Sequence, residues 1–303
     1  MSHFKNFKTC VYCTAQTLAS LDETTLARDY AYLEKYVGID KVYLETYRDG
    51  TWVAIDHMKM IQNFFKKHGV EIAGGITTVT PPLEKDDVKR QRLFQTFCYS
   101  NEAMRTYLKK IVTYTAELFD EIILDDFFFT SCTCDDCLRE RSNLSWAEFR
   151  SKKMIDVAEN LVLKPAKLAN PSVKVTIKYP NWRESYHETG YVPKIQPSMF
   201  DKIYTGTETR NTAHTDQHLP RYLSYSIMRY MEHVAPGRNG GGWFDTYSCW
   251  PIDCYLEQGY LTALSRPQEI TLFQWGDLFE NRLVTPLGIA YYCELPPVTP
   301  KKK

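Results

Sequence analysis

The chain has 303 residues, of which 44% are hydrophobic and 14% aromatic, enough apolar material to bury a large core. Lysine plus arginine and aspartate plus glutamate balance at 37 each, which argues against a nucleic-acid or membrane-surface partner and favours a neutral substrate. No apolar run approaches a membrane span, and residues 1–9 are too polar and too few for a signal peptide, so we expect a cytoplasmic protein unless a leader was removed. The oligomeric state, including a homo-oligomer, stays open.

Strand and helix patterns alternate along the chain. Short runs rich in β-branched and aromatic residues predict strands at 9–14, 40–46, 70–77, 122–124, 173–179, 202–207, 241–247 and 269–275. Apolar residues at helical spacing predict helices at 22–36, 56–67, 102–118, 146–168, 219–234 and 251–264. We expect Asp22 to cap the first helix, Gly38 to end it, and Pro165 to interrupt the fourth.

This alternation predicts an α/β protein, a (β/α)8 TIM barrel over residues 1–295. An open doubly wound sheet is the rival fold, but its dinucleotide-binding version needs a Gly-x-Gly-x-x-Gly turn that does not follow the first strand. The eighth helix is hard to identify after Asp277, and residues 296–303 are expected to form a Pro- and Lys-rich tail or a point of truncation. Function in such a barrel lies where the strands end.

Carboxylates and aromatic rings follow several of the predicted strands. Sugars have apolar C–H faces that stack on rings and hydroxyls that need polar partners, so this mixture is typical of a carbohydrate cleft. For Glu45, an ion pair with Arg48 competes with a role in binding sugar. The candidate substrate-binding residues are Glu45, Tyr179, Trp182, Arg210, Trp243 and Trp275.

A cysteine cluster follows the fourth strand. The run Cys-x-Cys-x-x-Cys lies in a polar loop, a spacing that suits a metal. The order of apolar strand, two polar residues and this cluster, with one further cysteine before the preceding helix, resembles glycoside hydrolase family 42 β-galactosidases over residues 98–149. The resemblance implies a (β/α)8 barrel with a structural zinc ion beside the catalytic cleft. Its ligands here would be Cys98, Cys132, Cys134 and Cys137.

The acidic residues depart from that family's pattern. The family has Asn-Glu at the end of strand four, with the glutamate as acid/base, where this chain has Asp125 and Asp126. The family's nucleophile glutamate after strand seven is missing, and Asp245 holds its place at best. The resemblance therefore supports the barrel and the zinc ion more strongly than it supports β-galactosidase activity.

Cleavage of a glycosidic bond needs two carboxyl groups, one to protonate the leaving oxygen and one to act as nucleophile or to activate water. Asp126 is our first candidate, because we expect it to share its pleat face with Ile122 and Leu124 and because it falls where the related family keeps its acid/base. Asp125 then points to the other side or supports it.

The second carboxyl group is expected after strand six or strand seven. Glu208 is preferred, although it could instead only pair with Arg210, and Asp245 stands behind it. Many barrel glycosidases that act on α-linkages use an aspartate after strand four as nucleophile and an acid after strand six as acid/base, so the assignment of the two roles stays open.

Two other functions compete with a glycosidase. A non-catalytic carbohydrate-binding barrel is favoured if the two carboxyl groups lie outside roughly 5 to 9.5 Å of each other. A metal-dependent hydrolase could use His214 and His218 as zinc ligands if they share a helical face, but Pro220 places them in a loop.

Overall fold

The computed structural model describes residues 3–79, 92–215, 217, 219–249 and 253–279. The strands are β1 Lys8–Cys13, β2 Lys41–Arg48, β3 Thr51–Trp52, β4 Glu71–Ile76, β5 Glu121–Leu124, β6 Lys174–Tyr179, β7 Lys202–Gly206, β8 Asn239–Asp245 and β9 Glu269–Phe273. The longer helices are α2 Glu23–Tyr36, α3 Ile55–Lys67, α4 Glu102–Leu118, α6 Trp146–Val157, α10 Leu223–Val234 and α11 Asp253–Leu264. Shorter helical segments are α1 Ala15–Ser20, η2 Leu93–Gln95, α5 Asp135–Arg141, η3 Ala158–Leu163, α7 Lys164–Ala169, η4 Arg183–Ser185, α8 Tyr186–Thr189 and α9 Gln196–Met199.

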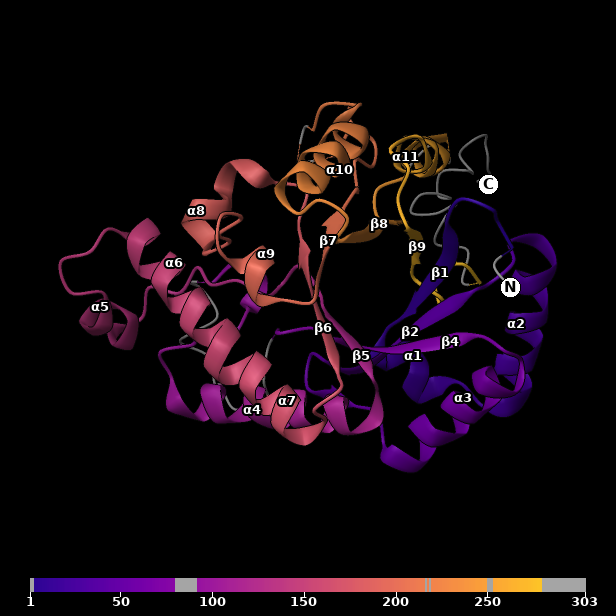
Figure 1. The fold of residues 1–303 in the computed structure, drawn as a ribbon, viewed down its shortest axis with the longest axis horizontal. Helices are drawn as coiled ribbons and strands as arrows, with labels where there is room; N and C mark the ends of the chain where they lie inside the picture. Colours follow the sequence, from indigo (N-terminus) through magenta and orange to yellow (C-terminus); the bar gives the residue numbers. More distant parts are fainter. Residues whose placement is uncertain (1–2, 80–91, 216, 218, 250–252, 280–303) are drawn as a thin grey trace, which may run out of the picture.

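The strands close into a parallel barrel. In the described part of the chain, eight strands follow one another in the order β1, β2, β4, β5, β6, β7, β8, β9, and β1 pairs with both β2 and β9. The short β3 is antiparallel to β2 and lies outside the ring. The helices surround the strands, as Figure 1 shows. The predicted (β/α)8 barrel is therefore confirmed.

Local signals set most of the element boundaries. The Asp22 carboxylate accepts a hydrogen bond from the Thr25 N–H at 2.7 Å and caps α2, as predicted. The helix predicted at 146–168 is instead α6, a π-helical segment η3 and then α7, with Pro165 in the first turn of α7. Proline has no N–H to donate within a helix, and a π segment just before it lets the chain continue.

Side chains alternate between the barrel interior and the layer of helices. Ile123 belongs to the interior cluster with Tyr12, Tyr43 and Trp243, whereas the two neighbours of Ile123 pack in the outer core against the helices. Asp125 is therefore the residue in phase with the interior row, and the expectation that Asp126 gains its position from the pleat face of Ile122 and Leu124 is wrong. The strand ends at Leu124, so a turn of the backbone orients Asp126.

The N-terminal end of the barrel is closed by a buried ion-pair cluster. Lys41 contacts Glu121 at 2.8 Å and Glu269 at 3.0 Å, and Glu269 also accepts a hydrogen bond from Tyr43 at 2.6 Å. These groups fill the interior at that end, which leaves the carboxyl ends of the strands for a binding pocket.

Two further expectations concern the domain boundary near the end of the chain and the absence of a membrane-spanning helix. The region after Asp277, including the 296–303 tail, lies almost entirely outside the described residues, so the domain boundary stays a prediction. Among the helices that the structure describes, none has the length and apolar content needed to span a bilayer.

Candidate active site

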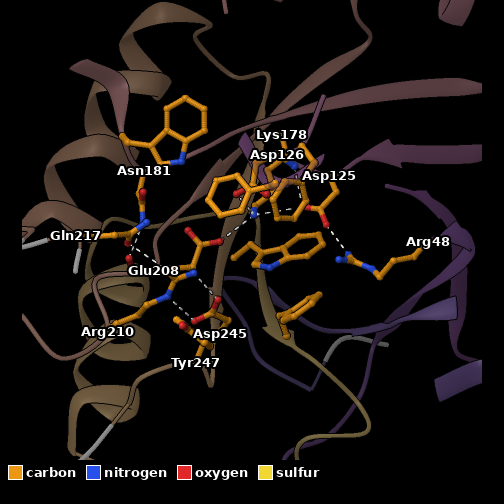
Figure 2. Close-up of a pocket in the computed structure, with 15 residues that line it drawn as sticks. Arg48, Asp125, Asp126, Lys178, Asn181, Glu208, Arg210, Gln217, Asp245 and Tyr247 are labelled. Carbon is orange, nitrogen blue, oxygen red and sulfur yellow. Dashed lines mark hydrogen bonds and ion pairs between the residues drawn. The ribbon is translucent and has the colours of Figure 1, made fainter. Parts of the chain in front are cut away.

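A pocket of about 330 Å³ lies at the C-terminal ends of the strands (Figure 2). Its size is within the usual range for small-molecule sites. Four carboxylates and three cationic side chains from the ends of different strands line it, together with aromatic rings. Of the sequence-predicted residues, it contains Asp125, Asp126, Trp182, Glu208, Arg210, Trp243 and Asp245.

Lys178, on β6, occupies the centre of the charged groups. Its Nζ donates to Asp126 Oδ2 at 2.7 Å and to Glu208 Oε1 at 2.8 Å, lies 3.6 Å from Asp125 Oδ1, and sits 4.3 Å from the centre of the Trp243 ring. Burial alone would lower the pKa of Lys178, but the three carboxylates outweigh burial and raise it. Lys178 is therefore a permanent buried cation that bridges carboxylates from the two strands flanking its own.

Sequence reasoning missed Lys178, although a signal was present. Val175 and Ile177 pack in the outer core, so Lys178 occupies an interior position of a strand whose other buried residues are apolar, aromatic or β-branched. A lysine at such a position is almost always paired with carboxylates.

Asp125 is held by two cations that also line the pocket. Its carboxylate accepts hydrogen bonds from Arg48 Nη2 at 2.6 Å, Thr77 Oγ1 at 3.1 Å and the Asp126 N–H at 2.7 Å. Burial raises the pKa of Asp125, but Lys178 and Arg48 more than offset this and hold it below its usual value. Asp125 is thus ionised, with its acceptor capacity largely occupied.

Asp126 is the more accessible of the two neighbouring acids. Its side chain is 18% exposed, against 3% for Asp125. Burial is the main reason that the pKa of Asp126 lies well above its usual value; Asp125 and Glu208 raise it further, while Lys178 opposes them. The pKa values of the two adjacent aspartates therefore shift in opposite directions, because both Arg48 and Lys178 lower that of Asp125, whereas Lys178 alone opposes the rise at Asp126.

Glu208 follows β7 and is almost completely buried. Its Oε1 accepts the hydrogen bond from Lys178, whereas its buried Oε2 has no hydrogen-bond partner among the described residues. A Cβ at Gly206 would lie 2.6 Å from Oε2, so only glycine leaves room for this oxygen. Burial and Asp245 raise the pKa of Glu208, and Lys178 and Arg210 oppose this shift.

Asp245 and Arg210 form a bidentate ion pair at the pocket wall. Arg210 Nε donates to Asp245 Oδ1 at 3.0 Å, and Nη2 donates to Oδ2 at 2.6 Å. The guanidinium group also donates to Gln217 at 2.9 Å and lies 5.2 Å from the centre of the Tyr247 ring. The hydrogen-bonded partner of Arg210 is therefore Asp245, and Glu208 interacts with Arg210 only through their charges.

Three predicted substrate-binding residues lie away from the pocket. Glu45 is fully buried behind it and bonds Arg48 Nε at 2.8 Å, the pairing considered from the sequence. Tyr179 faces the helices and its hydroxyl lies 3.3 Å from Gln196 Oε1. Trp275 is also buried in the outer core, so alternation along the strands turns both rings away from the interior.

The histidine alternative is only half described. His214 lies in a turn before α10, outside any helix, and His218 lies outside the described residues. The two therefore do not share a described helical face.

The four candidate metal ligands converge at one point. Their Sγ atoms all lie within 4.8 Å of one another, and Cys98 Sγ is 3.7 Å from that of Cys134 and 3.6 Å from that of Cys137. None of the four forms a disulfide. A tetrahedral zinc ion with Zn–S bonds of about 2.3 Å separates its sulfur ligands by about 3.8 Å, so the thiols fit such a shell.

Comparisons with known proteins agree with this fold. The catalytic domain of β-amylase from Paenibacillus polymyxa superposes with a TM-score of 0.61 at 9% identity, covering 92% of this chain and 94% of that one. The GH5_18 protein of Streptomyces cattleya, solved in complex with GlcNAc, superposes with a TM-score of 0.55 at 8% identity, covering 89% and 71%. At such identities these likenesses show the shared barrel and nothing finer.

Sequence relatives add the family. The uncharacterized protein SSO3021 of Saccharolobus solfataricus is 32% identical over 306 aligned residues, which cover 91% of this chain. The chain spans about half the length (50%) of that curated relative. A family model described as "Probable glycosyl hydrolase, catalytic domain" matches residues 1–286. The chain therefore belongs to this family of glycosyl hydrolase catalytic domains.

Proposed function

We propose that the protein is a retaining glycosidase that acts on a carbohydrate substrate, with Asp126 as acid/base and Glu208 as nucleophile. One observation carries the proposal: both carboxylates bond the same Lys178 Nζ, at 2.7 and 2.8 Å, so the two bonded oxygens cannot be farther apart than the sum of these distances. Retaining enzymes hold their carboxyl groups about 5 to 5.5 Å apart, and inverting enzymes about 6.5 to 9.5 Å. The bridge favours the retaining arrangement.

The assignment of Glu208 as nucleophile rests on its unbonded Oε2, and that of Asp126 as acid/base rests on its raised pKa. Glu208 Oε2 has no hydrogen-bond partner among the described residues, so its lone pairs are not engaged by the protein, while Lys178 holds the other oxygen. Asp126 is the more exposed acid and has the pKa raised well above its usual value, which suits a proton donor.

The reaction follows in two balanced steps. Glu208 Oε2 attacks the anomeric carbon as the bond to the leaving oxygen breaks, and Asp126 gives that oxygen its proton. Asp126, now ionised, takes a proton from water, whose oxygen attacks the same carbon and releases Glu208. Lys178 keeps its proton throughout and offsets the negative charge that passes between the two acids.

The remaining charged residues support this pair. Asp125, already bonded to Arg48, holds the Asp126 N–H and so orients its neighbour. Asp245 fixes Arg210 at the wall, where guanidinium and Tyr247 hydroxyl groups suit a sugar hydroxyl. Trp182 supplies an apolar surface for a sugar face.

We also propose a structural zinc ion held by Cys98, Cys132, Cys134 and Cys137. Four thiolates close a tetrahedral shell and leave no open coordination position, so the ion stabilises the fold and takes no part in bond cleavage. It would tie the loop that follows Asp126 to the segment before α4. The match to the cysteine pattern of family 42 supports this ligand set.

The test is hydrolysis of a panel of α- and β-linked aryl glycosides by the wild type, Asp126→Asn and Glu208→Gln. Asp120→Asn is the matched control, because Asp120 is exposed at the opposite end of β5. Loss of cleavage in both site variants and not in the control, with the product initially keeping its anomeric configuration by NMR, supports the proposal. No cleavage by the wild type, or full activity in either site variant, refutes it. An inverted product refutes the nucleophile assignment.

A further inference from the structure

Asn181 carries a buried acceptor that nothing in the described chain satisfies. It follows β6, lines the pocket and is 3% exposed. Its Nδ2 donates to the backbone carbonyl oxygen of Glu208 at 2.6 Å, and its Oδ1 is buried without a hydrogen-bond partner. Because a carbonyl oxygen can only accept, this contact fixes the amide orientation and leaves Oδ1 as the unpaired atom.

Asn181 and Glu208 both line this pocket (Figure 2). A Cβ built on Gly206 would touch Glu208 Oε2 at 2.6 Å and the Asn181 backbone nitrogen at 3.3 Å, so Gly206 lies against both residues. Both residues of this pocket carry a buried acceptor without a described partner, and leaving such an acceptor unpaired costs free energy, so a ligand that supplies a donor to Asn181 Oδ1 would be stabilised.

The chemistry of a sugar identifies the donor. If Glu208 Oε2 faces the anomeric carbon, the nearest substituents are those on its two ring neighbours, the ring oxygen and the second carbon. The ring oxygen has no hydrogen to donate. The hydroxyl on the second carbon is the group that can satisfy a nearby acceptor, and such hydrogen bonds strengthen in the glycosidase transition state.

We propose that Asn181 is a specificity-determining residue whose Oδ1 accepts a hydrogen bond from the 2-hydroxyl of the sugar unit bound next to Glu208. This inference rests on the proposed function for the identity of the carbon nearest Glu208. The substrate is then a 2-hydroxy sugar, and 2-deoxy sugars bind poorly, because a pocket built to bond a hydroxyl rejects the analogue that lacks it.

The test measures binding, so it needs no bond cleavage. Glucose and mannose are compared with 2-deoxyglucose, and galactose with 2-deoxygalactose, by calorimetry or ligand-observed NMR. The variants are Asn181→Ala, which removes the acceptor, and Asn181→Asp, which keeps it. Asn170→Ala is the control, because Asn170 precedes β6 at the opposite end of the strand and bonds Asp120 there.

The ratio of Kd values for the deoxy and hydroxy sugars separates recognition from a structural role. Loss of the bond to the Glu208 carbonyl weakens both sugars alike and cancels in the ratio. We expect the ratio to fall about tenfold or more in Asn181→Ala, the effect of one unpaired buried acceptor, and to stay as in the wild type in Asn181→Asp and Asn170→Ala.

Two outcomes overturn the proposal: an unchanged ratio in Asn181→Ala, or no binding of any of these sugars by the wild type. A ratio that behaves as expected in a protein that hydrolyses no glycoside refutes the acid-pair proposal and leaves the role of Asn181 standing.

Discussion

Replacement of Lys178 by methionine tests the charge balance of the pocket. The change keeps a long apolar stem over Trp243 and removes the cation shared by Asp125, Asp126 and Glu208. Removing one partner of a buried ion pair costs about 3 to 5 kcal/mol when the remaining charges cannot be neutralised. At neutral pH the free energy of unfolding of Lys178→Met should fall by that amount.

The loss should depend on pH in a defined direction. Burial already raises the folded-state pKa values of Asp126 and Glu208, and without the lysine they rise further above the unfolded values. Below about pH 3 these two acids are protonated in both states and the loss is small. At higher pH an acid can be ionised in the unfolded state and still protonated in the folded variant. For each such acid, the loss of unfolding free energy grows by about 1.4 kcal/mol per pH unit.

The wild type should show a weaker form of this dependence over the same range, because Lys178 opposes the raised pKa values of Asp126 and Glu208. The folded-state pKa of Lys178 is raised above the ordinary value of 10.5, so its stabilisation is fully present below that value and is lost only as pH rises through the folded-state pKa. Urea denaturation of both proteins at about pH 4.5 and about pH 8 measures the difference. Lys174→Met, an exposed lysine on the same strand, is the matched control. An equal deficit at both pH values, or one no larger than that of Lys174→Met, would refute the reasoning.

Three further predictions address the acids, the glycine beneath them and the cysteines. In the pH profile of kcat/KM, the acid limb should report the ionisation of Glu208, with a pKa above the usual glutamate value, and the alkaline limb the deprotonation of Asp126. Asp126→Asn should remove the alkaline limb and lower the rate by about 10² to 10⁴. Gly206→Ala should displace Glu208 Oε2 and lower kcat/KM by about a hundredfold, the cost of a shift on the order of 1 Å, and a wild-type rate would contradict the packing. The purified protein should hold about one zinc ion per chain by elemental analysis, and Cys134→Ser should release it and lower Tm, while Cys254→Ser should do neither.

The sequence by itself determined the architecture, because barrel strands and helices are encoded by local patterns. Short apolar runs that end in polar residues, separated by helices with caps such as Asp22, admit few folds other than a parallel barrel. It also determined where the polar rim lies, since the residues that follow the strands meet at one end. The spacing of Cys132, Cys134 and Cys137 was local as well, whereas Cys98 was added by the family resemblance, and the four thiols converge in the structure.

Only the tertiary structure decided which rim residues share a pocket and in what charge state. Side chains alternate along a strand, so a difference of one residue decides whether a side chain faces the barrel interior or the helices. Tyr179 and Trp275 face the helices, whereas Asp125 is in phase with the interior residues. Protonation depends on charges from other strands, and Lys178 meets Asp126 and Glu208 only when β5, β6 and β7 lie side by side. Contacts between residues so distant in sequence leave no local pattern, because they are set by strand register and barrel closure.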